Sequence, residues 1–213
     1  MSENIHDLIA SDSIDCLPYE IKNKLYHSIF CAAHFFGFTY FIDDLKIKLF
    51  IYEKSDFDKK KSELGIIKSD KLIAFMYNVN NIIVIKYDCI KERISLQSYM
   101  AIIVHEFIHV LQFYFSKISP GQYVWLYESI ACYLAGQKKN RSSLKIETWE
   151  VFERDFYSMK DCYEVAYRFG EAIFRLYPKE SLNIIKNPEF FKGRLIEMYN
   201  SEILGRRQKQ WLV

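Results

Sequence analysis

Residues that interrupt regular structure are scarce in this sequence. The chain has 213 residues but only 7 glycines and 4 prolines. Half of its residues are hydrophobic and 17% are aromatic, which is enough apolar surface for a substantial core. Low-complexity stretches and internal repeats of solenoid or propeller length are also missing. This composition argues against a disordered or repetitive protein and indicates one globular domain over 1–213, built as one body or as two closely joined lobes.

Paired cysteines are missing as well. The five cysteines are odd in number and include no C-x-x-C pair. They stand at Cys16, Cys31, Cys89, Cys132 and Cys162. This scatter indicates neither a disulfide framework nor a zinc site made of cysteines.

The chain also lacks an excess of charge of one sign. Its 29 basic and 27 acidic side chains leave a formal net charge of +2, so we expect no nucleic-acid partner and no membrane partner. No run approaches the roughly 18 apolar residues of a membrane span, and the start M-S-E-N-I-H-D-L-I-A lacks the apolar core of a signal peptide. The sequence therefore predicts a cytoplasmic protein, and it leaves the oligomeric state unknown.

Patterns of apolar residues predict a small sheet in the first part of the chain. Residues 18–36 have a helical period with Gly37 as a stop, and 56–64 read as a short polar helix. Alternating or continuous apolar runs then predict strands. The expected strands cover 45–52, 65–78 and 81–88.

The rest of the chain is expected to be helical. Residues 95–115 contain neither glycine nor proline and predict one long helix, for which Ser95 is the N-cap candidate. A second helix is expected over 122–135, with Gly136 as its C-cap. Strands followed by helices indicate the α+β class. We expect a sheet-containing N-terminal lobe over 1–118 and a helical C-terminal lobe over 119–213.

Three ionisable side chains interrupt the apolar helix expected over 95–115. The stretch V-H-E-F-I-H-V-L-Q places His105, Glu106 and His109 among Ile, Val, Phe and Leu. Burying a polar group without a partner costs about 2–7 kcal/mol, so these groups need one. Residues four apart on a helix lie about 5–6 Å from each other, so the two imidazoles can bind one ion. H-E-x-x-H on a helix is the zinc pattern of metalloproteases, with the glutamate as general base.

A third ligand is available in the next expected helix. A catalytic zinc site has three protein ligands and one open position. In W-L-Y-E-S-I-A-C-Y-L-A-G, Glu128 stands among aromatic and aliphatic neighbours, where a carboxylate is costly unless it is paired or bound to a metal. The breaker Ser119-Pro120-Gly121 lets the chain turn back between His109 and Glu128.

Together these two motifs resemble the gluzincin zinc metallopeptidases, in which H-E-x-x-H is followed by a glutamate in a W-L-x-E-x-x-A-x-Y context. This chain has H-E-F-I-H and then W-L-Y-E-S-I-A-C-Y, and the likeness covers 95–137. The resemblance implies a zincin-like fold with a small N-terminal sheet, an active-site helix and a helical C-terminal part. It also implies Zn²⁺ ligands at His105, His109 and Glu128, and a general base at Glu106.

Two weaker similarities point to the aminopeptidase-type branch of that family. The stretch D-C-Y-E-V-A-Y-R-F-G resembles the family's Y-E-x-A stretch, which implies that Tyr163 donates a hydrogen bond to the oxyanion, with Tyr167 as the alternative. The stretch A-F-M-Y-N resembles G-A-M-E-N, but Tyr77 replaces the glutamate that binds a free amino terminus. Cys132 stands where thermolysin-type enzymes have an aspartate.

The function that these residues predict is hydrolysis of peptide bonds in a peptide or protein substrate. The alternative is a catalytically weak or inactive zinc-binding protein with the same fold and a regulatory or interaction role. Glu106 favours the enzyme, because a purely structural zinc needs no base. Plainer alternatives for single residues are a hydrogen-bonded pair of core histidines at His105 and His109, and a packing role for Tyr163.

Overall fold

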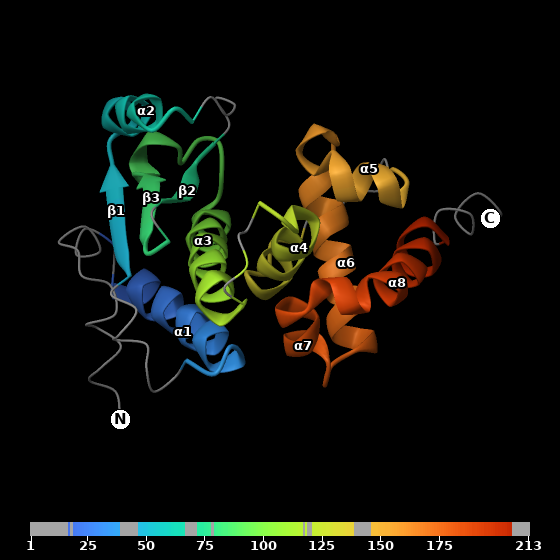
Figure 1. The fold of residues 1–213 in the computed structure, drawn as a ribbon. Helices are drawn as coiled ribbons and strands as arrows, with labels where there is room; N and C mark the ends of the chain where they lie inside the picture. The colour runs from blue at the N-terminus through green and yellow to red at the C-terminus, as the bar shows by residue number, and fades with distance from the viewer. Residues whose placement is uncertain are drawn as a thin grey trace, which may run out of the picture. The chain divides into compact units, whose positions relative to one another are not determined.

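The computed structural model describes residues 17, 19–38, 47–66, 72–77, 79–116, 118, 121–138 and 146–205. This part of the chain is mostly helical and contains one three-stranded sheet, so the predicted α+β class is confirmed (Figure 1). The chain divides into two compact units, Met1–Leu111 and Gln112–Val213. The boundary between the units lies within helix α3, Leu96–Ser116.

Two helices of the first unit form where the sequence predicts them. Helix α1, Tyr19–Phe35, buries a stripe that includes Leu25 and Ile29. It stops at Gly37, whose φ of 77° suits glycine and whose N–H donates to the carbonyl of His34. Helix α2, Lys54–Glu63, is polar and buries Phe57.

The sheet consists of β1, Lys48–Tyr52, β2, Ala74–Tyr77, and β3, Asn81–Ile85. The strand order is β1-β3-β2, with β1 parallel and β2 antiparallel to β3. The central strand is buried from Ile82 to Ile85, as a continuous apolar run predicts for a strand covered on both faces.

All three observed strands are shorter than the ranges predicted for them. The strand expected over 45–52 begins at Lys48, and residues 45–46 lie outside the described chain. The strand expected over 65–78 begins in fact with the turn after α2, because Gly65 has a φ of 66° and its N–H donates to Ser62 O. Strand β2 covers only the end of that range, and residues 67–71 and 78 lie outside the described chain. The strand expected over 81–88 ends at Ile85, and the chain then forms the 3₁₀ turn η4, Tyr87–Cys89.

Helix α3 confirms the long helix predicted over 95–115. It has 21 residues and contains neither glycine nor proline. The Ser95 hydroxyl accepts a hydrogen bond from the Ser98 N–H at 3.1 Å, which is the expected N-cap geometry. Despite the apolar character of α3, no helix among the described residues has the length and hydropathy needed to cross a membrane.

Beyond the end of α3, every regular element among the described residues of the second unit is a helix or a helical turn. Helix α4, Val124–Leu134, is slightly shorter than the predicted helix over 122–135. Its C-cap is Ala135, and the predicted cap Gly136 follows with a φ of 67°. The elements that follow are α5 (Trp149–Arg154), η5 (Phe156–Ser158), α6 (Cys162–Leu176), α7 (Ser181–Lys186), α8 (Pro188–Met198) and the π-helical turn η6 (Tyr199–Leu204).

A cluster of aromatic side chains forms the core of this second unit. Trp125 of α4 packs edge-on against Trp149 at 4.8 Å between ring centroids, and Phe152 stacks on Tyr199 at 4.7 Å. Phe169 of α6 contacts all four rings. The buried Tyr199 hydroxyl donates to the Glu147 carbonyl, and burial raises the pKa of this phenol. Aromatic rings therefore fix α4 relative to α5 and α6.

Helices α4 and α6 approach each other closely at one glycine. A Cβ atom added at Gly170 would lie 2.2 Å from the backbone oxygen of Ser129 and 2.8 Å from Cβ of Tyr133. Glycine is thus required there for space, since its φ is ordinary. Gly193 in α8 is the contrasting case, because an added Cβ would meet nothing within 4 Å.

We predict that Gly170→Ala lowers the free energy of unfolding by about 1–3 kcal/mol, because the methyl group forces α4 and α6 apart. The matched control is Gly193→Ala, which should leave stability unchanged or raise it by up to about 1 kcal/mol through helix propensity. Urea unfolding followed by circular dichroism measures both. Equal stability of the two variants would contradict the close packing of α4 on α6.

Candidate metal centre

A polar stripe runs along one face of α3. His105, His109, Gln112 and Ser116 are spaced by four, three and four residues, which places them on a single helical face. Most neighbouring positions from Ile103 to Leu111 are apolar and buried, and His105 itself is only 5% exposed. Such a stripe needs polar partners from another element.

Helix α4 supplies partners to the C-terminal half of this stripe. The buried Gln112 side chain donates from Nε2 to the Tyr127 carbonyl at 3.0 Å. The Tyr127 hydroxyl donates to Ser116 Oγ at 3.0 Å. The last two turns of α3 are therefore bonded to the backbone and side chain of the residue that precedes Glu128.

The two histidines of the stripe converge as their spacing predicts. Their Nε2 atoms lie 2.9 Å apart, and the rings are perpendicular with centroids separated by 4.6 Å. This pair can share one proton as a hydrogen bond, or direct two lone pairs at one ion when both Nε2 atoms are deprotonated. Tetrahedral zinc with bonds of about 2.0–2.1 Å would hold the nitrogens about 3.3 Å apart, so only a few tenths of an ångström of adjustment is needed.

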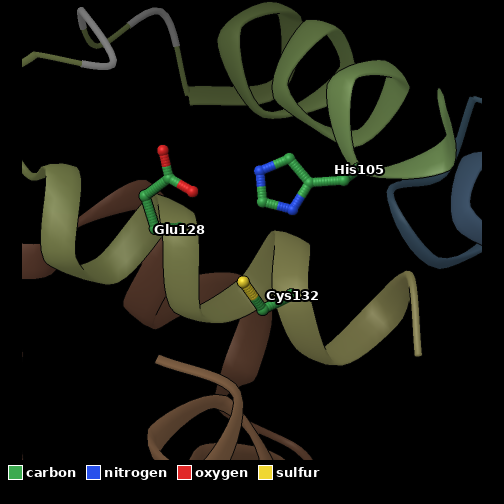
Figure 2. A group of neighbouring side chains, drawn as sticks. All are labelled: His105, Glu128 and Cys132. Carbon is green, nitrogen blue, oxygen red and sulfur yellow. The ribbon is translucent and has the colours of Figure 1, made fainter. Parts of the chain in front are cut away.

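One group of side chains among the described residues could hold a metal ion. His105, Glu128 and Cys132 are buried, and their candidate ligand atoms all lie within 4.8 Å of one another. Glu128 and Cys132 are one turn apart on α4, and Figure 2 shows both extending toward the His105 ring. His109 is not a member of this group, although its Nε2 is next to that of His105.

The Glu128 carboxylate has a neighbour that the sequence does not reveal. Tyr157 of η5 donates its hydroxyl to Glu128 Oε1 at 2.6 Å. The Glu128 carboxylate also influences Cys162 of α6. Burial is the main reason that the pKa of the Cys162 thiol is raised to about 11, and the charge of Glu128 acts in the same direction. The Cys162 thiol is therefore neutral near pH 7. Cys162 is not a member of the group formed by His105, Glu128 and Cys132.

The predicted catalytic residues lie on α3 and α6. Glu106 follows His105 and is partly buried. Tyr163 lies in the first turn of α6, is 42% exposed, and sets its ring edge-on to Phe156. Tyr167, one turn later, packs on Tyr133, and burial raises the pKa of its phenol. The assignment of Tyr163 or Tyr167 as the oxyanion donor stays a prediction, and so does that of Glu106 as the general base.

Sequence reasoning missed two members of this environment. Cys132 had a usable signal, since it stands four residues after Glu128 and so lies on the same face of α4. Tyr157 had none, because it is 29 residues from Glu128 and only the packing of η5 brings the two together.

Comparisons with known proteins give no assignment. No protein-family model, no curated protein and no solved structure matches this chain. The interpretation of the centre therefore depends on its residues and their geometry.

We predict that Gln112→Ala lowers the free energy of unfolding by about 1–3 kcal/mol, because it removes a buried hydrogen bond to the Tyr127 carbonyl. Gln97→Ala is the matched control, since Gln97 is exposed in the first turn of the same helix and its loss should change stability by less than about 0.5 kcal/mol. Urea unfolding compares the two variants. A Gln112 variant as stable as the control would show that the α3–α4 bond contributes nothing.

Proposed function

We propose that the protein is a zinc-dependent peptide-bond hydrolase of the gluzincin type, with a zincin-like fold. In this proposal His105, His109 and Glu128 bind Zn²⁺, and the substrate is a peptide or protein. The observation that carries it is the convergence of two Nε2 atoms at 2.9 Å on a helix whose sequence also places Glu106 beside the first histidine. A core pair of histidines does not require that glutamate.

The donor set fits zinc. Imidazole nitrogens and a carboxylate oxygen are ligands that catalytic zinc sites combine, and zinc also accepts a thiolate. Tetrahedral zinc holds its ligand atoms about 3.3–3.6 Å apart. The distances in the group of His105, Glu128 and Cys132, whose ligand atoms lie within 4.8 Å of one another, would need to contract by at most about 1.5 Å. Rotation about side-chain torsions can provide a change of this size.

The proposed chemistry assigns one task to each residue. Zinc, when bound, supplies a water with a pKa of about 7 and polarises the scissile carbonyl. Glu106 accepts a proton from the attacking water and delivers it to the leaving amine. Tyr163 donates a hydrogen bond to the carbonyl oxygen as it becomes negative, an effect worth about 10²–10³ in rate at comparable sites.

A second candidate function is a zinc-binding protein without turnover, with a regulatory or interaction role. Cys132 is the observation that favours it, because its thiol lies in the same buried group as His105 and Glu128. If His109 and Cys132 both bound the ion, four protein ligands would close the coordination sphere and leave no position for a water.

The proposed zinc site predicts how much zinc the purified protein contains. Purified protein should contain about one zinc per chain, and the double variant His105→Ala, His109→Ala should contain less than about a tenth of that amount. His27→Ala is the control, since His27 is exposed on α1 and should keep the wild-type content. Elemental analysis after metal-replete purification measures all three. Zinc retained in the double variant would place the metal elsewhere.

If Glu106 is the general base, its replacement should separate zinc binding from peptide cleavage. Glu106→Gln should keep zinc but reduce cleavage of a peptide library by at least about 10²-fold, because an amide cannot accept the proton. Glu92→Gln, an exposed residue ahead of α3, should cleave as the wild type does. Mass spectrometry reads the products. Wild-type cleavage by Glu106→Gln would contradict the assigned base, and zinc-loaded protein that cleaves nothing would support the second candidate.

A further inference from the structure

Tyr157 reaches a buried carboxylate from the surface of the second unit. Its side chain is 51% exposed, whereas Glu128 is 5% exposed, and the two are joined by the hydrogen bond from the phenol to Oε1. The O···O distance of 2.6 Å lies in the range of about 2.5–2.7 Å that is typical when a hydroxyl donates to an ionised carboxylate. This short bond engages one of the two oxygens of the Glu128 carboxyl group.

The turn that carries Tyr157 is held in place. Phe156 is buried and packs edge-on against Phe152 of the aromatic cluster at 5.7 Å. The Ser158 hydroxyl and N–H both donate to the Asp155 carbonyl, at 2.6 and 2.9 Å. The phenol thus extends from a fixed turn, and its reach to Glu128 does not depend on an unanchored loop.

We propose that Tyr157 is a positioning residue for the Glu128 ligand. Its phenol holds Oε1, so that a metal bound by the same carboxylate uses the other oxygen and binds in a monodentate manner. This inference rests on the proposed zinc function and adds a residue that the H-E-x-x-H pattern does not contain. Partners that hold a ligating side chain typically change metal affinity by about 10–100-fold when they are removed.

A purely structural role would have a different signature. If the phenol only compensated for burial of the carboxylate, its loss would lower stability and leave the bound metal unchanged. If it positions the ligand, its loss changes zinc affinity and the coordination mode of Glu128, even where the fold is intact. The measurement must therefore observe the metal directly.

The test compares Tyr157→Phe with Tyr123→Phe. Tyr123 also donates its hydroxyl to a glutamate of the second unit, Glu189, at 3.3 Å, so its variant removes the same kind of bond away from the candidate centre. Zinc affinity is measured by competition with a chromophoric chelator at constant pH. We expect Tyr157→Phe to bind zinc about 10–100-fold more weakly than the wild type, and Tyr123→Phe to bind it within about twofold.

Infrared difference spectra of zinc-loaded against metal-free protein give a second measurement, which reports on the coordination mode of the carboxylate rather than on zinc affinity. The wild type should show the wide separation of carboxylate stretching bands that monodentate binding produces, and Tyr157→Phe should show a narrower one. Unchanged affinity and spectrum in Tyr157→Phe, or bidentate bands in the wild type, would overturn the positioning role while the zinc site stands. Wild-type protein that binds no zinc would overturn the proposed function as well, so the two failures are distinguishable.

Discussion

A helix that is apolar on most of its surface cannot keep buried histidine and glutamine side chains unless another element supplies their partners. Helix α3 has such a stripe, and Gln112 shows how the requirement is met, because its amide donates to the carbonyl of Tyr127 at the start of α4. Tyr127 returns a bond to Ser116. Within the second unit, the end of α3 from Gln112 onward is thus bonded to α4 through polar groups that must be satisfied.

The position of α4 then determines how the rest of the second unit is built. Its apolar side is fixed by Trp125 in the aromatic cluster, and its contact with α6 is so close that position 170 has no room for a Cβ atom. These contacts leave Glu128 5% exposed. A carboxylate at such depth is costly without a donor, and Tyr157 provides one.

Local patterns in the sequence were sufficient for the helices and for the histidine pair. The spacing of four residues predicts the convergence of His105 and His109, and capping residues such as Ser95 and Gly136 mark helix ends correctly. Strand lengths were harder to predict, because the left-handed glycine at position 65 belongs to the turn after α2 rather than to a strand. The Tyr157–Glu128 bond was beyond sequence reasoning, since it exists only after α4 and η5 have packed into the same unit.

The chemistry of the centre turns on how the Cys132 thiol relates to His105. The Nε2 atom of His105 is the one beside His109, so an ion shared by the two histidines would bind there. Figure 2 shows that the ring nitrogen next to the carbon bearing the side-chain bond, Nδ1, lies on the side of Cys132. One imidazole ring presents its two nitrogens in different directions, and the nitrogen that does not ligate usually donates to an orienting partner. Two roles are therefore open to the Cys132 thiol, that of a further ligand and that of a neighbour that orients the His105 ring. A ligating thiol closes the coordination sphere, whereas a thiol that only orients His105 leaves a position for water, so the role of Cys132 separates the two proposed functions.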